Sequence, residues 1–167
     1  EEVDIMKKDI EMAAKAGAKC VVFGVLTKEG HLDVSTMQEL VRVAKDHSLE
    51  VTCHRAFDVA KEPLAFIDGL IDLGVDRLLT SGQKRIVVEG LELLAELKEH
   101  AGDKITIMPC GKLNSTNVDR VLAHGFTEVH TRPLETVSSQ MKRSSNLTMG
   151  SDDYDETSRV RINRADV

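Results

Sequence analysis

The side chains best suited to chemistry stand together in the segment Glu50–Asp58, which reads EVTCHRAFD. Its first half is apolar or β-branched, as expected for a half-buried strand. Its second half adds an imidazole, a guanidinium and a carboxylate from His54, Arg55 and Asp58. Ligands of α/β proteins bind beyond the carboxyl ends of parallel strands, so this segment predicts a functional site. The alternative is a strand end whose polar side chains simply reach solvent.

Residues that suit anion binding close two later apolar segments. Ser81 and Gly82 end DRLLTSG, and Gly111 ends KITIMPCG. The Arg55 guanidinium gives bidentate hydrogen bonds to a carboxylate or phosphate, and a helix that starts after such a segment supplies free backbone N–H groups. Together with Asp58, these residues predict a small-anion site at the strand ends.

A second pair of ionisable residues, Glu128 and His130, lies two positions apart in TEVHTRP. In one interpretation the two form an acid/base pair. In the other, Glu128 orients His130 or forms an interior ion pair with Arg55, which is a structural role. The sequence contains no nucleophile elbow, HExxH or paired-carboxylate motif. Whether the protein is an enzyme therefore stays open.

The elements that must position these residues alternate regularly along the chain. A helix with Gly17 just beyond its end is predicted over 3–16. Single amphipathic helical patterns separate the apolar segments that predict strands, at 20–26, 50–58, 76–82, 104–111 and 127–133. Such alternation implies a parallel sheet with right-handed crossovers. Beyond Leu134 the pattern fails, so 135–167 is predicted to be irregular, with 160–162 a short final strand or nothing regular.

Two architectures satisfy this alternation, an open doubly wound sheet and part of a (β/α)₈ barrel. No GxGxxG or GxxxxGK[ST] motif follows a strand, which disfavours a nucleotide-binding fold. Polar residues recur at alternate strand positions, which suits a barrel interior better than a sheet covered by helices on both faces. The α/β fold class is therefore predicted to be a partial TIM-type barrel with parallel strands. The residues predicted to share its interior face are Thr52, His54, Thr80, Thr106, Met108, Cys110, Glu128 and His130.

Composition limits the possible partners and surroundings. The 167 residues fit a single domain, 1–167, and the net charge of −6 disfavours binding to nucleic acid or an acidic membrane. No apolar run is long enough to span a bilayer, and no secretory signal is visible. Cys20, Cys53 and Cys110 lie far apart without a CxxC motif, which fits a reducing cytosol. The chain opens within a predicted helix and without a Met, as a fragment would.

Several motifs occur in the order in which a known family carries them, and on these the chain closely resembles the CutC copper homeostasis family. HRAFD and LLTSG are the most specific of them, and the resemblance is weakest over 151–167. The motifs are Phe23-Gly24-Val25-Leu26, His54-Arg55-Ala56-Phe57-Asp58, Asp76-Arg77-Leu78-Leu79-Thr80-Ser81-Gly82, Ile107-Met108-Pro109 and Glu128-Val129-His130, followed by Met141-Lys142-Arg143, Ser145 and Met149-Gly150.

The resemblance implies a TIM-type barrel, a cytoplasmic location, homo-oligomers and a link to copper. It also implies that this chain is the C-terminal part of a barrel, because family members normally begin with two further βα units that have no counterpart here. Two loops at the predicted barrel mouth depart from the family pattern. The glycine run after Met-Pro reads Cys110-Gly111-Lys112, and the small residues after Glu-Val-His are replaced by Thr131-Arg132-Pro133.

The implied copper would be Cu(I), which prefers thiolate and thioether ligands and accepts imidazole. Strand alternation turns Cys53 toward the helices when His54 faces the interior. Cys110 at a strand exit is then the best-placed thiol, with His54 and His130 as further ligands and Met108 as a soft support. Buried Cys and Met residues also fill core space without binding metal.

Two functions remain open from the sequence. The first is a CutC-type copper homeostasis protein that binds or buffers Cu(I) in the cytoplasm. The alternative is a TIM-barrel enzyme or metabolite binder with a small-anion site at the strand ends. The ligand-binding residues predicted for this alternative are Arg55, Asp58, Ser81, Gly82 and Glu128.

Overall fold

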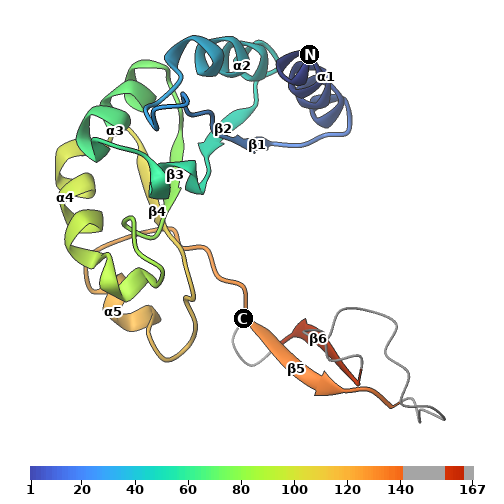
Figure 1. The fold of residues 1–167 in the computed structure, drawn as a ribbon, viewed down its shortest axis with the longest axis vertical. Helices are drawn as coiled ribbons and strands as arrows, with labels where there is room; N and C mark the ends of the chain where they lie inside the picture. The colour runs from blue at the N-terminus through green and yellow to red at the C-terminus, as the bar shows by residue number, and fades with distance from the viewer. Residues whose placement is uncertain (141–156, 164–167) are drawn as a thin grey trace.

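The computed structural model describes residues 1–140 and 157–163. A parallel four-stranded sheet of order β1-β2-β3-β4 forms its centre. The strands are β1 (Cys20–Phe23), β2 (Glu50–Cys53), β3 (Arg77–Thr80) and β4 (Thr106–Pro109). The helices are α1 (Glu2–Lys15), α2 (Val34–Asp46), α3 (Pro63–Asp72), α4 (Leu91–Ala101) and α5 (Val118–Leu122), with 3₁₀ turns η1 (Arg55–Val59) and η2 (Val87–Glu89). Figure 1 shows these helices around the outside of the curved sheet.

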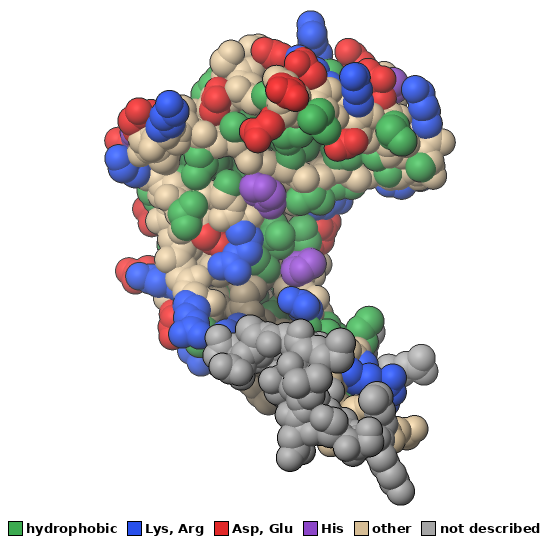
Figure 2. Space-filling model, turned by 45° about the vertical axis from the view of Figure 1, so that its right-hand side comes forward, with side chains coloured by type: hydrophobic (Ala, Val, Ile, Leu, Met, Phe, Trp, Pro, Cys, Tyr) green, Lys and Arg blue, Asp and Glu red, His purple; other side chains and the backbone are tan. Residues whose placement is uncertain are grey.

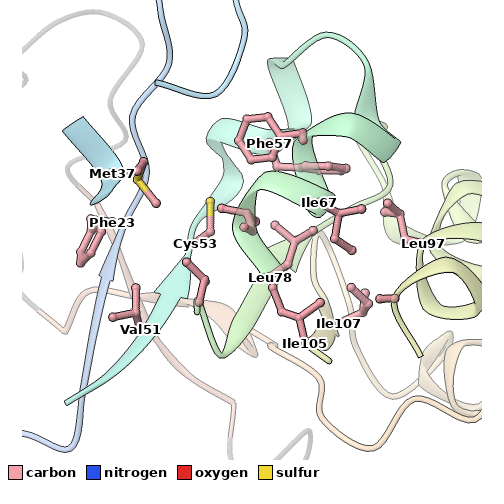
Figure 3. Close-up of a cluster of buried hydrophobic side chains, with 14 of the residues drawn as sticks. Phe23, Met37, Val51, Cys53, Phe57, Ile67, Leu78, Leu97, Ile105 and Ile107 are labelled. Atoms are coloured by element: carbon pink, nitrogen blue, oxygen red, sulfur yellow. The ribbon is translucent and has the colours of Figure 1, made fainter. Parts of the chain in front are cut away.

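The core lies between the outer face of the sheet and the helices. Residues paired across parallel strands share a face, and Phe23, Cys53, Leu78 and Ile107 form one such row. All four are buried, and Figure 3 shows them among side chains that the helices contribute, such as Ile67. The outer face is therefore apolar, and the polar strand positions are left for the inner face.

The inner face carries Val22, Thr52, Arg77 and Thr106 in one row of paired residues. Val22 is 58% exposed, so this face is open at the β1 edge. The predicted partial barrel with parallel strands is confirmed, since a curved sheet of four parallel strands has its helices on the outside (Figure 1).

Thr80 was predicted on the inner face, and this is wrong. Thr80 pairs with Pro109, two residues beyond the pair Leu78 and Ile107, so it shares their outer face. It is fully buried there. The inner-face position is taken by Leu79 instead. The error arose because a polar residue type was read as an inward one, whereas the Thr80 hydroxyl bonds a buried carboxylate described below.

The fifth predicted strand, 127–133, is also wrong. Its described backbone is irregular, and a single hydrogen bond from His130 N–H to the Pro109 carbonyl (2.9 Å) ties it to the β4 end. The chain forms two strands later, one where irregular structure was predicted and one that includes the possible short strand 160–162. β5 (Leu134–Ser138) and β6 (Ser158–Ile162) pair antiparallel in a separate ribbon. Across the described residues, no helix is long and apolar enough to cross a membrane.

Candidate functional site

The β2 exit is organised by His54, which caps the η1 turn. Its Nδ1 accepts a hydrogen bond from the Ala56 N–H (3.2 Å). An accepting Nδ1 places the proton of a neutral imidazole on Nε2. Neither ring nitrogen then offers a lone pair to a metal unless the cap breaks. His54 therefore acts here as a positioning residue for the Arg55–Asp58 turn.

The Arg55 guanidinium spans from β2 to β3. Its Nε donates to Asp58 Oδ2 (2.6 Å), and its Nη2 donates to Ser81 Oγ (2.8 Å). The hydrogen bond to Asp58 raises the pKa of Arg55. Burial acts against this rise, and the negative charge of Asp58 adds to it. Two of the three guanidinium nitrogens are thus held by the protein, and no described residue accepts from Nη1.

The Asp58 carboxylate occupies the loop that follows β3. Oδ1 accepts from the Thr80 hydroxyl (2.5 Å) and from the backbone N–H groups of Ser81 (3.1 Å) and Gln83 (3.1 Å). Burial opposes ionisation of Asp58. The hydrogen bonds from Thr80, Arg55, Gln83 and Ser81 outweigh burial, so the pKa of Asp58 is lowered from its usual value. The loop already holds an anion, and that anion is a side chain of the protein.

The backbone of this loop is packed closely against Gly90 at Ser81 and Gly82. Gly82 has φ +68°, and a Cβ added to it would overlap the Gly90 carbonyl oxygen. Its N–H donates to Thr80 Oγ1 (2.9 Å). Ser81 is fully buried, and its hydroxyl lies against both Asp58 and the Lys84 carbonyl. Asp58, Ser81 and Gly82 thus form a structural network in which Arg55 also takes part.

A cavity of about 230 Å³ opens one strand further along, at the β4 exit. It is lined by Arg55, Leu79, Cys110, Gly111, Lys112, Leu113, His130 and Arg132. Three of these side chains are Lys or Arg, and none of the described lining residues is a carboxylate. Figure 2 shows Lys, Arg and His side chains along the hollowed side of the molecule. This cavity is referred to below as the β4-exit pocket.

The pocket wall includes a backbone held in an unusual conformation. Gly111 has φ +102°, and Lys112 has φ +52°, which side-chain-bearing residues seldom adopt. The Asn117 side-chain amide donates to the Lys112 carbonyl (3.0 Å) and stabilises this turn. Strained residues held in this way concentrate at ligand sites. The turn brings Lys112 to the pocket edge.

Cys110 is the thiol that lines the β4-exit pocket. It is 2% exposed, and its backbone N–H donates to the Thr80 carbonyl (2.9 Å). Burial raises the pKa of the Cys110 thiol to about 11, with Arg55 acting against this rise and Asp58 adding to it. Cys110 and His130 are thus brought together in one pocket as predicted, but the thiol is protonated at neutral pH.

The remaining predicted metal ligands do not join them. His54 and Met108 do not line the pocket. Cys53 lies in the hydrophobic core, as predicted, where burial raises the pKa of its thiol to about 12. Among the described residues, no group of three or more His, Cys, Asp or Glu side chains is arranged to hold a metal ion. Met141–Arg143, Ser145 and Met149 lie outside the described residues.

Glu128 belongs to a different network, on the inner face. Arg77 Nε donates to Glu128 Oε2 (2.7 Å), and Arg77 Nη1 donates to Glu50 Oε2 (2.6 Å). These hydrogen bonds, that from Glu128 first, raise the pKa of Arg77. The predicted interior ion pair exists, but its cation is Arg77 and not Arg55. In this arrangement Glu128 is engaged by an arginine and is not paired with His130.

Sequence reasoning missed Lys112, Arg132 and Gln83 as functional or positioning residues. A signal was present for the first two, because they lie in the two loops at which the sequence is expected to differ from the CutC pattern. The first of these loops places Lys112 after a glycine, and the second places Arg132 before a proline. Gln83 carried no such signal, since its side chain bonds the carbonyls of Phe57 (3.1 Å) and Ala60 (2.8 Å) only in the folded loop.

The curved parallel sheet, its outer helices and the polar residues at its strand ends define the chain as part of a (β/α)-barrel protein. A family model described as the CutC family matches residues 1–134. The chain belongs to the CutC family.

Known proteins of the family resemble the chain over most of its length. It is 44% identical over 152 residues to a CutC family protein of Parabacteroides distasonis and 40% identical over 151 residues to the human copper homeostasis protein cutC homolog. These matches cover 90% and 89% of this chain but 62% and 55% of the relatives. A crystal structure of CutC from Streptococcus agalactiae matches with a TM-score of 0.72 and 28% identity, over 77% of this chain and 63% of that one. The chain thus spans less than two thirds of the length of these relatives.

Proposed function

We propose that the chain acts in copper homeostasis as a CutC-type protein. The observation that carries this proposal is family membership, together with the names of the human and mouse relatives as copper homeostasis protein cutC homologs. Copper is here the cargo of the protein. The finer proposal, direct Cu(I) binding or buffering by this chain, depends on the donors that its own residues offer.

Those donors form an incomplete Cu(I) site. Cys110 and His130 line one pocket, but its other described lining residues include three cations and no further thiol, thioether or imidazole. The positive charges of Lys112 and Arg132 oppose a bound cation. Cu(I) must also displace the proton of a thiol whose pKa is about 11, so affinity falls as pH is lowered. Any Cu(I) site of this chain alone is therefore expected to be weak.

Anaerobic Cu(I) competition against a chromogenic chelator tests this proposal. The full chain is compared with Cys110→Ser and with Cys53→Ser, in which a core thiol is changed as the matched control. We expect weak competition that is lost in Cys110→Ser and retained in Cys53→Ser. Loss only in Cys53→Ser would contradict the pocket assignment, and no competition by a folded wild-type chain would leave this chain without a Cu(I) site of its own.

We also propose that the chain is a cytoplasmic homo-oligomer. Its three cysteines are free, as in a reducing compartment. β1 lies at the edge of the sheet, where unpaired backbone groups invite pairing with another chain. Sedimentation of wild type is expected to show a species larger than the monomer, and Val22→Lys is expected to shift it toward monomer. Val160→Lys, an equally exposed valine in β6, is the control. A monomeric wild-type chain would contradict the proposal.

A further inference from the structure

We propose that the β4-exit pocket binds a small phosphate monoester through Arg55, Lys112 and Arg132. This inference does not depend on the copper proposal, since it uses none of the soft donors. It shares Arg55 with the anion site predicted from the sequence but replaces Ser81 and Gly82 with Lys112 and Arg132. Ser81 binds the protein's own Asp58 carboxylate and the Gly82 N–H donates to the Thr80 hydroxyl oxygen, so the proposed anion site lies one strand further along the sheet.

Uncompensated positive charge is the first observation that favours an anion. Lys112 and Arg132 line the pocket, and neither side chain makes a hydrogen bond or ion pair with a described residue. Elsewhere on the sheet the cations are paired, as Arg77 is with two glutamates. Like charges gathered without a counterion repel one another, and a bound anion removes that repulsion.

Preorganised donors are the second observation. Arg55 is fixed by Asp58 and Ser81 through two nitrogens, so its remaining nitrogen is available without much loss of side-chain freedom. Gly111 and Lys112 have positive φ, and no described residue accepts a hydrogen bond from their backbone N–H groups. Unpaired N–H groups in a turn with positive φ form anion-binding hollows. The pocket thus offers charged and neutral donors together.

The size and position of the pocket select the class of anion. A volume of about 230 Å³ lies below the roughly 300–1,000 Å³ of pockets for drug-sized ligands, so it suits a phosphate group on a short carbon stem. Three cationic side chains reach it from three different chain segments, which matches the three terminal oxygens of a phosphate better than the two of a carboxylate. The pocket also lies at the carboxyl ends of parallel strands, where barrel proteins bind ligands.

Calorimetric titration of the full chain tests this inference, with glycerol 3-phosphate, inorganic phosphate and malonate as probes in a chloride buffer of low ionic strength. Three variants each remove one positive charge. Arg132→Gln and Lys112→Gly each remove a positive charge from the pocket. Glycine is chosen at position 112 because it tolerates the positive φ there. Lys104→Ala removes a positive charge from the exposed segment that precedes β4, at the other end of that strand.

We expect glycerol 3-phosphate to bind the wild type more tightly than malonate does, and inorganic phosphate to bind more weakly than the ester. Arg132→Gln and Lys112→Gly are each expected to weaken ester binding about tenfold or more, since each removes a charge-assisted hydrogen bond. Lys104→Ala is expected to bind as the wild type does. Equal weakening in all three variants, tighter binding of malonate, or no heat from any probe with a folded chain would overturn the inference.

Discussion

The exits of β3 and β4 have the same local design but opposite electrostatic states. Each follows a strand with a glycine and then a side-chain-bearing residue at positive φ, namely Gly82-Gln83 and Gly111-Lys112. At the β3 exit the backbone N–H groups and hydroxyls converge on Asp58. At the β4 exit the described residues provide no carboxylate, and cations line the cavity.

This difference separates a structural anion site from a ligand site. When the protein itself supplies the carboxylate that such a loop binds, the hydrogen bonds between loop and carboxylate stabilise the fold. The same type of loop without an internal carboxylate keeps its binding capacity for a ligand. The consequence is that perturbing the β3 exit should lower stability, whereas perturbing the β4 exit should mainly change binding.

The largest effect is expected from Gly82→Ala. The added Cβ would overlap the Gly90 carbonyl oxygen, and position 82 has φ +68°. Overpacking and backbone strain together should cost about 4 kcal/mol of the free energy of unfolding. Gly111→Ala is the matched change at the other exit, where the Cβ would lie 3.0 Å from the Ser81 Cβ, and it should cost less. Urea unfolding of both variants measures the difference, and an equal or reversed cost would contradict the contrast.

Asp58→Asn should have the next largest effect. It removes the charge that the β3 exit loop binds, and should lower the free energy of unfolding by about 2–3 kcal/mol at pH 7. The folded pKa of Asp58 is lowered, so its stabilisation is present above the usual carboxylate range, about 4, and is lost as pH falls through the folded pKa. The gap between wild type and Asp58→Asn should therefore narrow below about pH 4.

The control for this pH dependence is Asp103→Asn, which changes an exposed carboxylate in the turn that follows α4. Its free energy of unfolding should follow that of the wild type at every pH. If the gap between wild type and Asp58→Asn stays constant down to pH 3, Asp58 does not titrate with a lowered pKa and the β3 exit is not an anion site.

A smaller pair of effects, opposite in sign, is expected at the two residues with positive φ. Lys112→Gly relieves strain and should stabilise the chain by about 0.5–1 kcal/mol. Gln83→Gly relieves similar strain but removes the hydrogen bonds of the Gln83 amide to Phe57 and Ala60, and should destabilise the chain by about 1 kcal/mol. Thermal unfolding of the two variants is the measurement. Stabilisation by both would mean that the Gln83 side chain contributes little.

The parallel strands and outer helices were predictable because hydrophobic period and glycine positions are local signals. The apolar outer row from Phe23 to Ile107 follows directly from alternation. The predicted strand 127–133 failed for a physical reason. A short run of β-prone residues is a strand only when a neighbour supplies a ladder, and only the His130 N–H bonds to the β4 end.

The candidate site was predictable in its location but not in its pairing. The sequence indicates that Arg55, Asp58 and Ser81 meet at the strand ends, and they do. It does not indicate which of them bind one another, because a carboxylate that fills a loop and one that faces a ligand have the same residue type. Lys112 and Arg132 become candidates only when the fold shows that they line one pocket in which the described residues place no carboxylate.

We propose that the β4 exit, unlike the β3 exit, keeps an anion site that the described residues leave unfilled. Urea unfolding of the wild type and Arg132→Gln at increasing glycerol 3-phosphate concentration tests it most directly, because a ligand that binds only the folded chain stabilises it with the logarithm of its concentration. We predict that added ester stabilises the wild type and that Arg132→Gln needs about tenfold more ester for the same gain in stability. The same rise in both proteins, or none in either, would contradict the account.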